Sequence, residues 1–93
     1  MPKYYPFKIG GYYLYFTSQC VIEAMHVHAS DKQLTEGGSA KFWVGADGST
    51  KVQKRGRLSN KSILEIQEYI KMNYSEMYDL WRQYSNNGFY NNI

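Results

Sequence analysis

The sequence has one cysteine, two histidines and two prolines among its 93 residues. A single cysteine, Cys20, excludes an internal disulfide and any zinc site built from several cysteines. No apolar run approaches the roughly 18 residues of a membrane span, and the N-terminus lacks the charged-then-apolar pattern of a secretion signal. We therefore expect a protein of the reducing cytoplasm that has no contact with a membrane.

The charge of the chain is small but unevenly distributed. The formal net charge is +3, and residues 1–58 contain eight lysines or arginines against four acids, whereas residues 59–93 contain three against four. This asymmetry favours an anionic partner for the first part of the chain, with an ordinary solvated surface as the alternative. The ten tyrosines suit a surface that is partly wet and contacts a partner, because tyrosine joins a large ring to a polar tip.

Residue patterns predict one α+β domain over residues 12–84, preceded by an arm or edge strand at 1–11 and followed by a frayed, Asn-rich tail at 85–93. The domain is expected to hold a four-stranded antiparallel sheet and a C-terminal helical hairpin packed on one face. The predicted strands are residues 12–17, 25–30, 39–44 and 50–55. Asp47-Gly48 predicts a tight turn between the last two strands, because both residues tolerate a positive φ.

Two start signals predict the two helices. Ser59 suits the N-cap of a helix that runs to Met72 with isoleucines at helical spacing. Asn73, followed three residues later by Glu76, has the pattern of a capping box and predicts a second helix to about Tyr84.

The segment 25–30 carries both histidines, His26 and His28. Side chains alternate between the faces of a strand, so the two imidazoles are predicted to share one face while Val27 points to the other. The face covered by the helices is predicted to hold Leu14, Phe16, Val27, Phe42, Val44 and Val52. The open face is predicted to hold Tyr13, Tyr15, His26, His28, Lys41, Trp43, Lys51, Gln53 and Arg55.

Three interpretations of the histidine pair remain open. A neighbouring pair of imidazoles can hold one neutral ring as base and one protonated ring as acid, which makes His26 and His28 candidate catalytic residues. They could instead be ordinary hydrogen-bonded sheet residues. A metal site would need Glu23, Asp31 or Cys20 to complete it, and none has diagnostic spacing. We therefore expect no metal and no cofactor, and an unreactive thiol at Cys20.

The open face also has the composition of a surface that binds single-stranded nucleic acid, where bases stack on aromatic rings and phosphates meet cations. The candidate RNA- or ligand-binding residues are Tyr13, Tyr15, Lys41, Trp43, Lys51 and Arg55. The alternative, weighted equally, is that Trp43 and the tyrosines form a dimer interface or a second, smaller core.

Several stretches together resemble the small bacterial domain-of-unknown-function 4160 family over about residues 12–84. The stretches are Tyr13-Leu14-Tyr15-Phe16, Glu23-Ala24-Met25-His26-Val27-His28, Ala40-Lys41-Phe42-Trp43-Val44, Leu58-Ser59 at a helix start, and Asn73 to Trp81 with Met77. The chain departs from the family pattern at Ala24 and Met25, where the family has proline, and at Ser39, where it has an acid. The resemblance implies a toxin-like role in a two-gene toxin–antitoxin module, carried by the positions His26, His28, Lys41, Phe42 and Trp43.

The leading hypothesis is therefore a toxin-like protein that acts on RNA through the face of His26 and His28, with a small antitoxin-like protein as partner. In such RNA cleavage one imidazole would take the 2′-hydroxyl proton and the other would protonate the leaving oxygen. The alternative hypothesis is a non-catalytic adaptor whose exposed sheet docks a partner protein or pairs in a homodimer.

Overall fold

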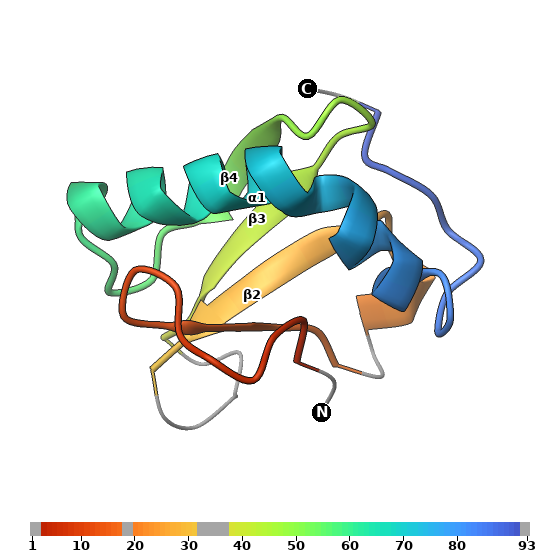
Figure 1. The fold of residues 1–93 in the computed structure, drawn as a ribbon. Coiled ribbons are helices and arrows are strands. Elements are labelled where there is room, and N and C mark those ends of the chain that lie inside the picture. Colours follow the sequence, from red (N-terminus) through yellow and green to blue (C-terminus); the bar gives the residue numbers. More distant parts are fainter. Residues whose placement is uncertain (1–2, 18–19, 32–37, 92–93) are drawn as a thin grey trace.

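The computed structural model describes residues 3–17, 20–31 and 38–91. Its sheet has four strands in the order β1-β2-β3-β4, all antiparallel: β1 (Tyr13–Tyr15), β2 (His26–Ser30), β3 (Ala40–Val44) and β4 (Thr50–Lys54). A short 3-10 turn, η1 (Cys20–Ile22), lies between β1 and β2, and the helix α1 (Asn60–Trp81) follows β4. Figure 1 shows α1 crossing one face of the sheet, which confirms the predicted α+β class.

The predicted helical hairpin is wrong, because one continuous helix of 22 residues replaces it. Ser59 is the N-cap, as expected, and its hydroxyl accepts a hydrogen bond from the Ser62 N–H at 3.2 Å. Asn73 does not cap a second helix, because its side-chain amide donates to the Tyr69 carbonyl one turn earlier, at 2.9 Å. The buried positions form a single stripe that continues through this point: Ile63, Ile66, Ile70, Met77 and Trp81. No glycine or proline interrupts it.

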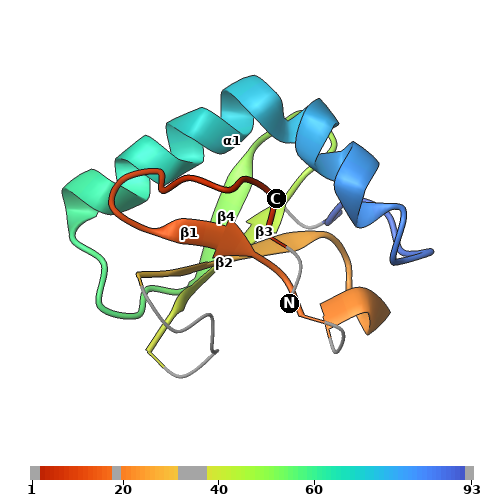
Figure 2. The same ribbon diagram turned by 60° about the horizontal axis from the view of Figure 1, so that its bottom comes forward.

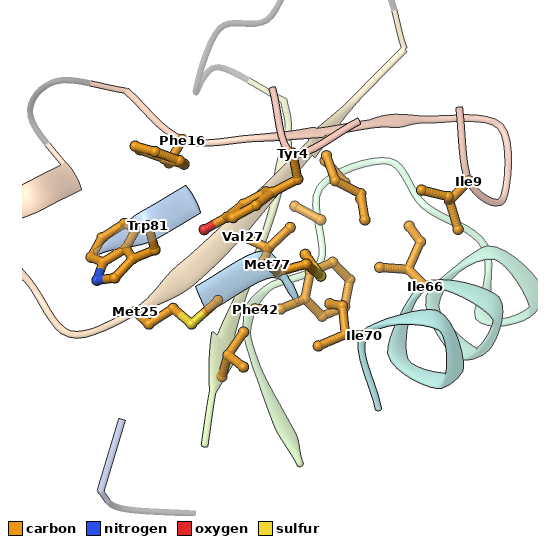
Figure 3. Packing of buried hydrophobic residues seen from close by; sticks show 14 of the residues in the cluster. Tyr4, Ile9, Phe16, Met25, Val27, Phe42, Ile66, Ile70, Met77 and Trp81 are labelled. Carbon is orange, nitrogen blue, oxygen red and sulfur yellow. The ribbon is translucent and has the colours of Figure 1, made fainter. Parts of the chain in front are cut away.

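The core lies between α1 and the sheet. Figure 3 shows Val27 and Phe42 from the strands packed with Met77 and Ile70 from the helix. Five of the six residues predicted for this face are buried, and Val52 is the exception with 37% of its surface exposed. Val52 lies on β4, an edge strand that α1 covers only in part, so the alternation was predicted correctly but the burial was not.

The Asp47-Gly48 turn joins β3 to β4 as predicted. Asp47 accepts a hydrogen bond from the Ser49 N–H at 2.9 Å. Gly48 has φ 85°, and a Cβ there would lie 2.6 Å from the Tyr74 ring, so both the backbone conformation and the close approach of α1 require glycine.

Segments before and after the sheet complete the core. In the N-terminal arm, Tyr4 and Ile9 are buried, and the Tyr4 N–H donates to the Leu14 carbonyl at 2.8 Å. After α1, residues 85–91 return to the sheet, where the Tyr90 N–H donates to the Val44 carbonyl at 2.8 Å. Figure 1 shows this return from the end of α1 to the β3–β4 turn. The described part of the chain contains no helix with the length and apolar character of a membrane span.

The continuous helix makes two capping residues respond differently to the same substitution. We expect Ser59→Ala to lower the free energy of unfolding by about 1 kcal/mol, because the helix N-terminus loses its cap. We expect Asn73→Ala to change it by no more than about 0.5 kcal/mol, because alanine is the better helix former at an interior position. Urea denaturation of the two variants measures both effects. Losses of similar size in both variants would contradict the single helix.

Candidate functional site

Both histidines are buried. The side chains of His26 and His28 leave β2 on the side opposite Val27, as the alternation predicts, but only 0% and 4% of their surfaces are exposed. The expectation that the two rings stand on an open face is therefore wrong. The chain just before β2 covers both rings, and Trp81 at the end of α1 contacts the His26 ring with centroids 5.5 Å apart. In Figure 2 η1 lies below the sheet while α1 lies above it. Their assignment as catalytic residues stays a prediction.

His26 is held in one tautomer. Its Nδ1 lies 2.9 Å from the Ala24 carbonyl oxygen, which can only accept, so Nδ1 carries the proton and Nε2 carries a lone pair. Nε2 is buried without a hydrogen-bond partner among the described residues. The Glu23 carboxylate lies near it, with Oε1 at 3.9 Å. Leaving such a group unsatisfied in the interior costs about 1–3 kcal/mol.

His28 contacts the cysteine. The Cys20 Sγ lies 3.2 Å from His28 Nε2, and both residues are buried. Thr17 approaches the same sulfur from the end of the preceding segment, its backbone N–H donating at 3.3 Å and its hydroxyl lying at 3.1 Å. The two imidazole rings stand perpendicular to each other with centroids 5.0 Å apart. Cys20, His26 and His28 thus offer one donor atom each within 4.8 Å of one another.

Burial makes both imidazoles neutral at physiological pH. Burial, assisted by the positive charge of Lys41, lowers the pKa of His26 to about 4. Burial likewise lowers the pKa of His28 to about 4, assisted by Lys41. The hydrogen bond from Lys41 lowers the pKa of the Glu23 carboxyl. A general acid works best with a pKa near the working pH, so these rings are poorly suited to exchange protons at neutrality.

Lys41 and Trp43 lie beside the histidines on β3, where Trp43 pairs with His26 and Lys41 pairs with His28. The Lys41 ammonium is 2.9 Å from the Glu23 carboxylate and 4.4 Å from the centre of the Trp43 ring. Tyr90 stacks on Trp43 at 4.5 Å with an interplanar angle of 13°. The indole N–H donates to Gln53. The ring is thus already covered by neighbours and offers little area on which a base could stack.

The other predicted binding residues lie in different surroundings. Tyr15 is buried against His28, with ring centroids 5.5 Å apart, and Lys51 is exposed opposite Trp43. Tyr13 lies farther out on β1, where Lys3 and Lys8 approach its ring. Arg55 leaves the site altogether and contacts the start of α1 through the Leu58 carbonyl and the Asn60 side chain.

The register of β4 explains the position of Arg55. Lys51 pairs with Trp43 and Val52 with Phe42, but Lys54 rather than Gln53 lies opposite Lys41. This irregularity inserts one residue, as a β-bulge does, and shifts the alternation for everything after it. Nothing in the residue pattern reveals such an insertion.

Sequence reasoning gave too little weight to the residues that cover the histidines. Cys20, Glu23 and Thr17 all contact the site, and Tyr90 reaches it from the far end of the chain. Cys20 and Glu23 precede the histidines by only a few residues, so their closeness in sequence was a usable signal. Tyr90 had none, because the return of the tail depends on where α1 ends.

A small antiparallel sheet with one covering helix and a buried histidine pair on the second strand defines a compact α+β protein with an enclosed polar cluster. A family model described as "Domain of unknown function (DUF4160)" matches residues 11–82, which include all four strands and α1. The chain belongs to this family. No curated protein and no solved structure matches it significantly.

Burial of the histidines predicts a loss of stability in mild acid. The unfolded chain takes up protons near the usual imidazole pKa of about 6.5, whereas the folded rings resist protonation down to about 4. The contribution of the two neutral rings to the free energy of unfolding is therefore fully present above about pH 6.5. It declines as the pH falls toward 4, by up to about 3 kcal/mol for each ring. Urea denaturation between pH 7.5 and 4.5 measures the decline.

The matched control for this decline is the double variant His26→Asn/His28→Asn, which titrates at neither position. Glu23 also loses stabilisation as the pH falls, so the diagnostic quantity is the difference between wild type and variant. That difference should change steeply over this range. Imidazole pKa values near 6.5 in the folded wild type, followed by NMR, would contradict the prediction.

Proposed function

We propose that the protein acts by binding, as the toxin-like member of a toxin–antitoxin module, and that it docks an acidic extended segment of a small partner protein at the outer edge of β4. The observation that carries the proposal is the character of this edge. It is the last strand of the sheet, and Lys51, Val52, Gln53 and Lys54 are all exposed. An exposed sheet edge binds an extended peptide through main-chain hydrogen bonds.

The two edges of the sheet differ in whether another segment of the chain covers them. At β1 the N-terminal arm covers the edge, with a bridge from Lys3 to Tyr15 and a hydrogen bond from the Tyr4 N–H to the Leu14 carbonyl. No described segment pairs with the outer edge of β4. The chain thus closes one edge with its own residues and leaves the other available to another chain.

The positive charge of the β4 edge favours an acidic partner. Residues 51–57 contain four cations and no acid, and Lys51, Lys54, Arg55 and Arg57 are all exposed. Two copies of this edge would repel each other, which disfavours a homodimer through β4. An acidic strand would be attracted, which supports a protein partner of opposite charge.

The same geometry supports binding over catalysis. A reacting 2′-hydroxyl would have to come within hydrogen-bond reach of imidazoles that are 0% and 4% exposed. The nearest aromatic platform, Trp43, is stacked on Tyr90. RNA contact through the exposed lysines of β4 remains the competing interpretation, and the partner experiment distinguishes it.

Reversing the charge of β4 should weaken the complex. We expect Lys51→Glu/Lys54→Glu to reduce the affinity for the small protein encoded beside this one by at least about 10-fold, because like charges would oppose across the new strand pair. Calorimetric titration of the purified pair measures the affinity. The matched control, Lys8→Glu/Lys61→Glu, makes the same change in net charge at exposed positions away from β4.

Three results would contradict the docking proposal. One is the absence of a complex with wild type, and another is an equal loss of affinity in the β4 variant and its control. The third is a gel shift in which single-stranded RNA binds wild type with a steep salt dependence and is lost only in the β4 variant. That result would show that the β4 edge binds RNA instead of a partner protein, because phosphate contacts weaken strongly with salt.

The histidines should have no part in any effect on RNA. We expect wild type and His26→Asn/His28→Asn to leave cellular RNA equally intact when expressed at equal levels, because the rings are buried and neutral. Asparagine at position 26 can keep the hydrogen bond to the Ala24 carbonyl. RNA cleavage by wild type that disappears in a folded double variant would restore the catalytic hypothesis.

A further inference from the structure

We propose that Cys20, His26 and His28 form a binding site for Zn²⁺, with a fourth coordination position open to water or to the Glu23 carboxylate. None of these residues belongs to the docking edge on β4, and the proposal does not rest on a partner protein binding there. It also departs from the expectation, based on residue spacing, that the chain binds no metal.

The first support is the geometry of the donors. The thiol and the two imidazoles place one donor atom each within 4.8 Å of the others, and Cys20 Sγ is 3.2 Å from His28 Nε2. Around a tetrahedral zinc ion, with Zn–S about 2.3 Å and Zn–N about 2.0 Å, sulfur and nitrogen ligands lie about 3.5 Å apart. The cluster is thus near the size of a zinc site before any metal enters it.

The second support is the tautomer of His26. A ligating histidine commonly donates its other ring N–H to a backbone carbonyl, which fixes the ring and leaves the opposite nitrogen for the metal. His26 has this arrangement, because Nδ1 donates to Ala24 and Nε2 is buried without a hydrogen-bond partner among the described residues. A metal ion would bind the lone pair of His26 Nε2, which accepts no hydrogen bond from the described residues.

The third support is the surroundings of the sulfur. The Thr17 N–H donates to Cys20 Sγ, and the Thr17 hydroxyl lies at hydrogen-bond distance from it. Donors aimed at a sulfur stabilise its thiolate form, which is the form that binds metals.

Glu23 makes the charge of the site acceptable. A zinc ion with one thiolate and two neutral imidazoles carries a net charge of about +1, which burial would oppose. The Glu23 carboxylate lies 3.9 Å from His26 Nε2, and 43% of its side chain is exposed, so it can balance this charge from the solvent side. It now pairs with Lys41 at 2.9 Å and would move only a short way to the metal.

The donor set selects among metals. One thiolate with two imidazoles suits a borderline-soft cation and excludes Mg²⁺ and Ca²⁺, which prefer oxygen ligands. Zinc accepts a tetrahedral site of three protein ligands and one exchangeable position. Copper also accepts two histidines and a cysteine, so the experiment must separate the two metals.

The test is a metal titration of the full chain after treatment with a chelator. Co²⁺ serves as the visible probe, because a cysteine ligand gives a thiolate-to-cobalt charge-transfer band and tetrahedral geometry gives intense visible bands. Zn²⁺ should then displace Co²⁺ at one equivalent and raise the melting temperature. Because metal binding displaces the thiol proton, the zinc affinity should fall as the pH is lowered.

Variants connect these signals to the three residues. Cys20→Ser should abolish the charge-transfer band, and His26→Asn should weaken zinc binding by at least about 100-fold while keeping the donor to Ala24. Thr17→Val, which removes only the hydroxyl beside the sulfur, should weaken it by about 10-fold. Lys8→Glu/Lys61→Glu is the surface control and should bind as wild type does.

Each variant is first compared with wild type in the absence of metal by circular dichroism and thermal melting. If His26→Asn does not fold, Cys20→Ser and Thr17→Val carry the test, since neither removes a buried ring. The proposal is overturned if wild type shows no charge-transfer band with Co²⁺, or if Cys20→Ser binds zinc as tightly as wild type. Tight binding of Cu⁺ without binding of Zn²⁺ would overturn the assignment to zinc.

Discussion

Strand β2 is covered on both faces, and the rest of the structure follows from that constraint. His26, Val27, His28 and Ala29 are all buried, although an antiparallel strand with a helix on one side ordinarily leaves alternate residues in water. The core of α1 covers Val27. The chain just before β2 forms a second, polar layer over the histidines, and Trp81 at the end of α1 also contacts the His26 ring. The two imidazoles must therefore find partners without solvent.

That polar layer is assembled from sequence-local pieces. The Ala24 carbonyl receives the His26 N–H, the Cys20 sulfur meets His28, and Glu23 lies between His26 and Lys41. The tail after α1 holds the layer in place, since Ser85 donates to the Val21 carbonyl at 2.6 Å and Met25 donates to the Gly88 carbonyl at 2.9 Å. The segment after α1 thus stabilises the surroundings of β2.

Alternation along the strands predicted which side chains share a face, because a period of two is a property of the extended backbone itself. It could not predict burial, which depends on what lies above the face. The histidines were therefore placed on the correct side but in the wrong environment. The predicted position of Arg55 was wrong because one extra residue in β4, opposite Lys41, changes the alternation, and the residue pattern does not reveal this insertion.

The helix shows the same limit in another form. The residues around Asn73 have a start signal that is locally valid, yet Ile70 and Met77 on either side belong to one stripe against one sheet. Packing along the whole stripe outweighs a cap worth about 1 kcal/mol, so the helix continues. Local signals decide an end only where the buried stripe also ends, as it does at Trp81.

One carboxylate links the enclosed cluster to the cationic side of the sheet. Glu23 neutralises Lys41 at 2.9 Å and lies 3.9 Å from His26 Nε2. A cation bound among Cys20 and the histidines would attract this carboxylate and weaken its pair with Lys41, which lies opposite Lys54 of β4. The positive charge presented beside β4 would then increase with metal occupancy. An acidic partner would bind the metal-loaded form better, and by linkage its binding would favour the metal.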